Sequence, residues 1–295
     1  MSRIGIFFLW LVHWLPLPMQ AALGNLLGSL LYRFAGRRRR IGEINLQWCF
    51  PQWDQAHRDA VLRDHFRCAA RAALEHGILW WSPVKRVKRL VHFAGLEHFQ
   101  PLHGQPVILL APHFVGLDMG GVRFTASYAP IVSMYSRMKN PHFDRLMLHA
   151  RTRFGNSKMF SRHDGVRPLV REVRQGLPLY YLPDQDFGAK DAAFVPFFGV
   201  PAATVTALPR IARVAGARVV PCVTRQLPGG KGYVAQFYPA WDNFPSEDVD
   251  ADTRRMNAFI EDRVREMPEQ YFWLHKRFKT RPPGEPPFYR AAGKG

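Results

Sequence analysis

Acidic residues are scarce in this chain, and none occurs before Glu43. The 295 residues include 41 Lys and Arg against 23 Asp and Glu, which gives a formal net charge of +18. A surface of this sign attracts anionic partners, which include nucleic acid, phospholipid headgroups and acidic proteins. Charge alone does not choose among them, but a hydrophobic content of 47% with 22 Phe favours a membrane surface.

Cysteine is also rare, and Cys49, Cys68 and Cys222 lie far apart in the chain. Their odd number and wide spacing argue against a disulfide framework and against a zinc site. We predict that each is a small buried hydrophobic residue in a reducing compartment. Neither a metal nor a cofactor is predicted. No internal repeat or low-complexity linker is found, and a single α/β domain is ordinary at this length.

Charged residues are absent from residues 4–32, a run long enough to cross a bilayer about 30 Å thick. A cleaved signal peptide is the alternative, but the run is long for one and four arginines follow it at residues 37–40. Pro16 and Pro18 interrupt the run, so two helices with a bend are as compatible as one spanning helix.

From these features we expect residues 1–36 to be a membrane-associating segment, either a membrane helix or a hairpin. The arginine cluster that follows is expected on the cytoplasmic side, against anionic headgroups. Residues 37–295 are expected to form the rest of the protein as one domain.

After residue 55 the pattern changes from a long helix to short apolar runs that alternate with amphipathic stretches. This order favours an α/β fold with a mostly parallel central sheet flanked by helices. Strands are predicted at residues 107–111, 131–135, 179–182, 218–224 and, as an outer strand, 233–238. Helices are predicted at residues 55–81, 117–127, 141–154, 166–175, 205–215 and 252–266.

A His-x4-Asp spacing, His113 to Asp118, follows the first buried strand at a strand-to-helix turn. In parallel sheets, sites form at the carboxyl ends of strands. Histidine suits the removal of a hydroxyl proton during acyl transfer, and a carboxylate can fix its tautomer. The alternative for His113 is a residue that caps the helix start. A second match, His92 to Glu97, follows no buried strand, and we interpret His92 as structural or exposed.

Two further clusters lie at predicted element ends. Asp184 and Asp186 follow a strand and could orient a base or bind a cation, or simply form the turn. Arg151 and Arg153 lie at the end of a predicted helix, where they could hold a phosphate or carbonyl oxygen. A solvated helix end stabilised by the helix dipole is the alternative.

Taken in order, these motifs resemble the lipid A biosynthesis (lauroyl/myristoyl) acyltransferases of the lysophospholipid acyltransferase superfamily. The resemblance extends from the hydrophobic amino terminus to near the carboxyl end. It is carried by the His113–Asp118 box, by the block from Tyr135 to Arg153, by the Asp184 and Asp186 turn, by residues 195–206 and by residues 273–282.

The resemblance implies direct transfer from an acyl-acyl carrier protein to a hydroxyl of a lipid A precursor, at the cytoplasmic face of the bacterial inner membrane. It implies that His113 is the base and Asp118 its partner, with Arg151, Arg153, Asp184 and Asp186 in substrate binding. Residues 37–295 are then the acyltransferase domain. No acyl-enzyme intermediate is implied.

Two positions depart from the family pattern, because Pro112 stands where many members have Asn and Asp118 where many have Glu. An acyltransferase for another glycolipid, lyso-lipid or aminolipid acceptor therefore stays open. A noncatalytic membrane-tethered protein that binds nucleic acid or anionic lipid is a further alternative. We do not predict nucleic acid as a partner, because no nucleic-acid-binding motif is present.

Overall fold

The short apolar runs form the inner strands of a seven-stranded sheet. The computed structural model describes residues 3–138, 140–161 and 164–289. The expected membrane-associating segment, residues 1–36, and the expected domain, residues 37–295, therefore each extend beyond the described residues, at positions 1–2 and 290–295 respectively. Sheet neighbours pair in parallel throughout, except for β8 and β9, which are antiparallel. In spatial order the strands are β1 (Val91–Ala94), β9 (Tyr233–Phe237), β8 (Arg218–Gln226), β2 (Val107–Leu110), β5 (Leu179–Tyr181), β3 (Val132–Tyr135) and β4 (Lys158–Ser161).

This sheet confirms the predicted mostly parallel α/β class. The short connection at residues 227–232 accounts for the antiparallel pair, since parallel neighbours need a long crossover. One prediction is wrong: β9 is not an outer strand, because β1 pairs along its other side. A separate two-stranded antiparallel ribbon, β6 (Ala192–Phe197) with β7 (Val200–Val205), was not predicted; it ends at Val205, so the helix predicted at residues 205–215 begins two residues later.

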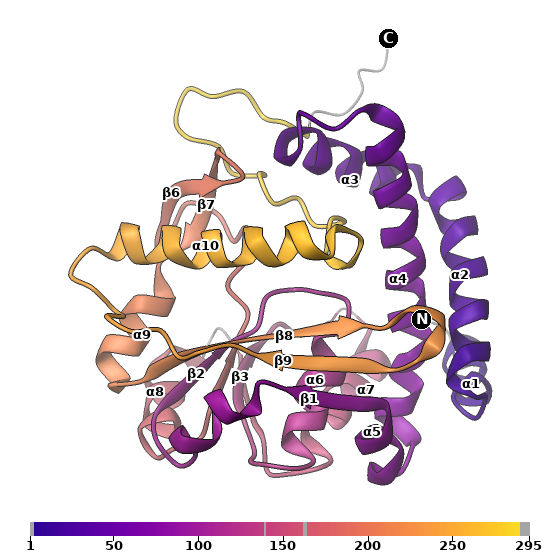
Figure 1. Cartoon of the computed structure of the whole chain (residues 1–295), viewed down its shortest axis with the longest axis horizontal. Helices are drawn as coiled ribbons and strands as arrows, with labels where there is room; N and C mark the ends of the chain where they lie inside the picture. The colour runs from indigo at the N-terminus through magenta and orange to yellow at the C-terminus, as the bar shows by residue number, and fades with distance from the viewer. Residues whose placement is uncertain (1–2, 139, 162–163, 290–295) are drawn as a thin grey trace.

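Helices cover both faces of the sheet (Figure 1). Alternate residues of β2 explain why, because Ile108 and Leu110 join one hydrophobic cluster while Val107 and Leu109 join the other. The helices are α1 (Arg3–Val12), α2 (Leu17–Phe34), α3 (Gly36–Cys49), α4 (Gln55–Trp81), α5 (Val84–Leu90), α6 (Leu117–Thr125), α7 (Pro141–Thr152), α8 (Arg167–Arg174), α9 (Ala207–Ala215) and α10 (Val249–Glu266).

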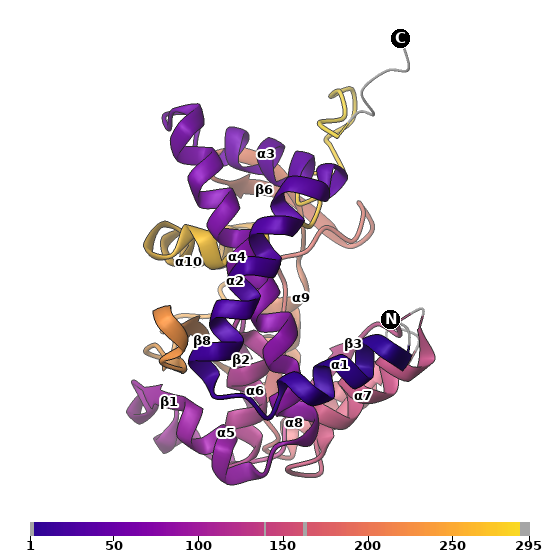
Figure 2. The ribbon, with the colours of Figure 1, turned by 90° about the vertical axis from the view of Figure 1, so that its right-hand side faces the viewer.

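The amino-terminal apolar run forms two helices, α1 and α2, with the bend at the prolines that the sequence predicted. In Figures 1 and 2, α2 runs beside α4. Glycines allow this close approach, since a Cβ at Gly24 would lie 2.6 Å from Cγ of Arg71 and one at Gly28 would meet the Arg67 backbone. Within the part of the chain that the structure describes, no helix is both long enough and apolar enough to cross a membrane.

The apolar side chains of α1 and α2 are nevertheless exposed on one side. Ile4, Phe7 and Trp14 expose 80%, 58% and 67% of their surface, and Phe34 at the end of α2 exposes 76%. Several large apolar side chains exposed on neighbouring helices are typical of an interaction surface.

Candidate active site

His113 and Asp184 meet at the carboxyl ends of two neighbouring parallel strands. His113 follows β2 and Asp184 follows β5, and the two strands pair directly. The His113 backbone N–H donates to Asp184 Oδ2 at 2.9 Å, and His113 Nδ1 lies 2.7 Å from Asp184 Oδ1. Asp184 is 2% exposed, so this contact lies in the interior of the site.

This contact determines the tautomer of His113. A carboxylate oxygen only accepts, so Nδ1 carries the proton and donates it to Asp184. Nε2 is then the free acceptor, as a general base requires. Burial alone would raise the pKa of the Asp184 carboxyl, but the positive charge that His113 carries when protonated and the hydrogen bonds it donates outweigh burial and hold that pKa below its ordinary value.

Asp118 does not contact His113 in the described structure, contrary to the expectation that it fixes the His113 ring. Asp118 lies in the first turn of α6, where Oδ1 accepts from Arg151 Nε at 3.0 Å. Arg151 Nη2 lies 2.9 Å from the same oxygen, and Asp118 Oδ2 lies 3.2 Å from His76 Nε2. Spacing predicted a pair, but both carboxylate oxygens of Asp118 have other partners.

His76 is a site residue that the sequence analysis missed. Its Nδ1 lies 2.6 Å from the carbonyl oxygen of Ala72, one turn earlier on α4. Both ring nitrogens thus face atoms that only accept, an arrangement that favours the doubly protonated imidazolium. Burial opposes this charge, but the hydrogen bond and negative charge of Asp118 outweigh it and raise the pKa of His76. No local spacing could reveal His76, because α4 meets α6 only through tertiary packing.

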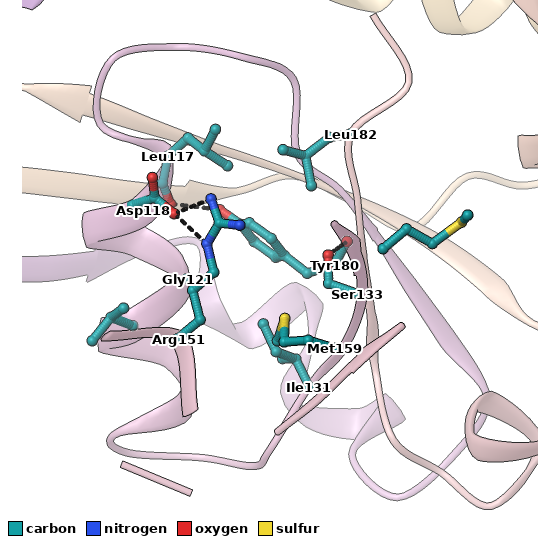
Figure 3. A pocket seen from close by; sticks show the side chains of 11 residues that line it. Leu117, Asp118, Gly121, Ile131, Ser133, Arg151, Met159, Tyr180 and Leu182 are labelled. Carbon is teal, nitrogen blue, oxygen red and sulfur yellow. Dashed lines mark hydrogen bonds and ion pairs between the residues drawn. The ribbon is translucent and has the colours of Figure 1, made fainter. Parts of the chain in front are cut away.

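His113 lines a cavity of about 420 Å³ whose walls are mostly apolar side chains. Arg151 also lines it, together with residues from β3, β5 and α9 such as Met134, Tyr181 and Ile211. A smaller apolar pocket of about 40 Å³ adjoins this cavity and is lined by Asp118. Arg151 belongs to both spaces, and Figure 3 shows its guanidinium turned toward Asp118 at the edge of the smaller pocket.

The other two predicted binding residues have partners within the protein. Arg153 donates to the carbonyl oxygens of Leu79 and Ser82 at the end of α4, both at 2.9 Å. Asp186 accepts from the N–H of Thr280 at 2.6 Å and from its hydroxyl at 2.8 Å, which secures the carboxyl-terminal segment. Neither residue lines the two spaces just described. A substrate contact for either of them stays a prediction.

The side chains of the described residues do not favour metal or thiol chemistry at the site. Among the described residues, no group of three or more His, Cys, Asp or Glu side chains could hold a metal ion. Burial raises the pKa of the Cys68 and Cys222 thiols to about 12, and Cys49 is buried as well. Thiols in this state are poor nucleophiles at neutral pH.

Comparison with known proteins gives one consistent result. Residues 1–280 match the family described as bacterial lipid A biosynthesis acyltransferase. The lipid A biosynthesis lauroyltransferase of Escherichia coli is 36% identical over 98% of this chain and 94% of its own. The lipid A biosynthesis palmitoleoyltransferase of the same organism is 31% identical over 98% of this chain and 94% of its own. The myristoyltransferase of that organism is 36% identical over 86% of this chain and 80% of its own.

A solved structure, the 1-acyl-sn-glycerophosphate acyltransferase of Thermotoga maritima, is more distant. It is 14% identical, with a TM-score of 0.37 over 82% of this chain and 96% of that one. The match to the family and the identities to its curated members decide the assignment. This chain belongs to the bacterial lipid A biosynthesis acyltransferases.

Proposed function

We propose that this protein transfers a fatty acyl group from an acyl-acyl carrier protein to a hydroxyl of a lipid A precursor, as a late secondary acylation. One observation carries the mechanism: His113 donates from Nδ1 to the buried Asp184, and the same residue lines a largely apolar cavity of about 420 Å³. An acyl chain needs such a lining, and its acceptor needs a base beside it.

In the proposed step, His113 Nε2 takes the proton of the acceptor hydroxyl while its oxygen attacks the thioester carbonyl carbon. The tetrahedral intermediate collapses, the carbon–sulfur bond breaks, and the imidazolium returns the proton to the departing thiolate. The products are the new ester and the free carrier thiol. Asp184 stabilises the imidazolium that forms in between. No covalent acyl-enzyme intermediate is required.

We assign Asp118 a positioning role in place of direct contact with His113. It holds Arg151, which lines both the large cavity and the smaller pocket. The guanidinium could donate to the thioester oxygen or to a phosphate of the acceptor. Arg153 and Asp186 would support the site from outside the cavity.

We also propose that the protein acts at the bacterial inner membrane with its site toward the cytoplasm. Residues 1–36 would associate with the membrane, and residues 37–295 would be the acyltransferase domain. The exposed apolar side chains of α1 and α2 and the arginines at residues 37–40 support this arrangement. Another lyso-lipid or aminolipid acceptor is the alternative. The curated relatives are named for lauroyl, palmitoleoyl and myristoyl transfer, so their names do not decide the acyl chain.

The test is His113→Ala assayed with acyl-acyl carrier protein and a lipid A precursor in detergent. Loss of the general base should lower kcat by about 10³-fold or more. Mass spectrometry of lipids from a deletion strain identifies the acceptor. Undiminished turnover would refute the mechanism, and an altered phospholipid or aminolipid with normal lipid A would move the acceptor to the alternative.

A further inference from the structure

A basic groove lies between α8 and the end of α9, outside the site described above. It encloses about 400 Å³. Val166, Val170 and Val214 give it an apolar lining, and Arg167 and Arg171 stand beside them as exposed side chains. Arg174 completes the basic rim. A groove with apolar and basic walls suits an amphipathic partner that carries negative charge.

The positive charge of this groove is only partly neutralised by the described residues around it. In the described residues, no carboxylate forms an ion pair with Arg167 or Arg174. Arg171 Nη2 lies 3.7 Å from Glu172 Oε1. The other oxygen of this buried carboxylate, Oε2, already lies 2.7 Å from Lys158 Nζ. Arg174 donates to the carbonyl oxygen of Val214. The groove thus presents net positive charge to a partner.

The groove adjoins the catalytic cavity. Val166 lines both the groove and the cavity that contains His113. A partner seated between α8 and α9 would therefore lie beside an opening toward the base. This continuity distinguishes the groove from other basic surfaces of the chain, such as the exposed Lys85 and Lys88 of α5.

The position of the groove favours a soluble protein over a lipid surface. In Figure 1, α8 and α9 lie at the left of the molecule, and α1 and α2 with their exposed apolar side chains lie at the right. Figure 2, seen from the α1 and α2 side, places these two helices in front and α9 behind them. A membrane that meets α1 and α2 would leave the groove facing water.

We propose that the α8–α9 groove is the docking surface for the donor, a small acidic carrier protein that presents an acyl thioester on a flexible arm. This inference rests on the proposed function, because it places the partner of that same reaction. An acidic helix of the carrier would lie along Arg167 and Arg171, and its arm would enter the cavity beside Val166. Complementary charge across such a rim acts mainly on encounter and affinity, not on the chemical step.

The test variant is Arg167→Glu/Arg171→Glu, which spares Arg174 because that side chain links α8 to α9. The matched control is Lys85→Glu/Lys88→Glu, which reverses two exposed charges on α5. Each protein is assayed with lauroyl-acyl carrier protein and with lauroyl-pantetheine, which has the same arm but neither protein nor phosphate. Fluorescence anisotropy measures the Kd for unacylated carrier protein, and Arg167→Lys/Arg171→Lys tests whether charge suffices.

We expect the glutamate variant to raise the carrier Kd and KM at least about 10-fold, with lauroyl-pantetheine turnover unchanged. The control and the lysine variant should stay within about twofold of the parent. An unchanged carrier Kd overturns the proposal. Binding to anionic phospholipid vesicles is measured in parallel, and a glutamate variant that loses only this binding also overturns it. If the parent transfers no acyl group from either thioester, the proposed function fails, while anisotropy still decides whether the groove binds the carrier.

Discussion

The two aspartates near the cavity have opposite environments. Asp184 contacts one imidazole, that of His113, whose Nε2 remains available. Asp118 contacts the guanidinium of Arg151 and the imidazole of His76, and the cluster carries one net positive charge when His76 is protonated. The first arrangement prepares a base, and the second fixes a cation beside an apolar pocket. A carboxylate near a histidine therefore identifies a role only when its other partners are known.

The largest effect should come from Asp184→Asn. An amide in this place can donate to Nδ1 and so favours the tautomer that lacks a free Nε2 acceptor. We expect kcat to fall by about 10³-fold or more with little change in KM. Steady-state kinetics with the acyl carrier donor measure both values. A fall below 10-fold would mean that Asp184 does not set the His113 tautomer.

A smaller effect is expected where Arg151 loses its fixed position. Asp118→Asn and Arg151→Lys should each lower kcat/KM by roughly 100-fold, because a preorganised donor is lost or displaced. The double variant should be little worse than either single one, because both disturb the same contact. Fully additive losses would show that the two residues act separately.

His76→Gln should lower kcat/KM less than Asp118→Asn, since Arg151 still holds Asp118. The effect of this variant on the free energy of unfolding should depend on pH. Because the folded pKa of His76 is raised, its contribution to stability is fully present below its unfolded pKa of about 6.5. That contribution disappears as the pH rises through the folded pKa.

Denaturant unfolding between pH 6 and 9 measures this difference between the parent and His76→Gln. The charged groups around His76 are Asp118 on α6, Arg151 on α7 and Glu75 on α4. Burial raises the pKa of Glu75, so the comparison is repeated with Glu75→Gln in both proteins. A stability difference that does not vary with pH would show that His76 is not an imidazolium in the folded protein.

The smallest effect on catalysis is expected for Arg153→Ala. Its two hydrogen bonds secure the end of α4, so the free energy of unfolding should fall by about 1.5–3 kcal/mol. Activity of the folded variant should stay within about twofold of the parent. A large loss of kcat without a loss of stability would support the prediction that Arg153 binds substrate.

The sheet and half of the site could be predicted because they follow from local pattern. The apolar run of β2 locates His113, and that of β5 locates Asp184, so parallel pairing brings both residues to one edge. The spacing of His113 and Asp118 did not predict the hydrogen-bond partners of Asp118, because spacing does not report the direction of a side chain on the first turn of a helix. His76 comes from a distant helix and leaves no local signal.

The missed strands have equally physical reasons. β4 is a four-residue strand at the edge of the sheet with Lys158 and Ser161 at its ends, so it lacks an apolar run. The ribbon of β6 and β7 contains Pro196 and Pro201 opposite each other, and proline argues against a strand except where hydrogen bonding is incomplete.

The close contact of α2 with α4 bears on how substrate reaches the base. Gly24 rests against Arg71, and His76 lies five residues further along the same uninterrupted helix, about 7.5 Å in axial rise. If lipid takes up α1 and α2, α4 sets the depth of the Asp118 carboxylate relative to the headgroups. The amino-terminal helices would then align the reacting groups of two substrates that arrive from opposite phases, beyond simply retaining the enzyme at a surface.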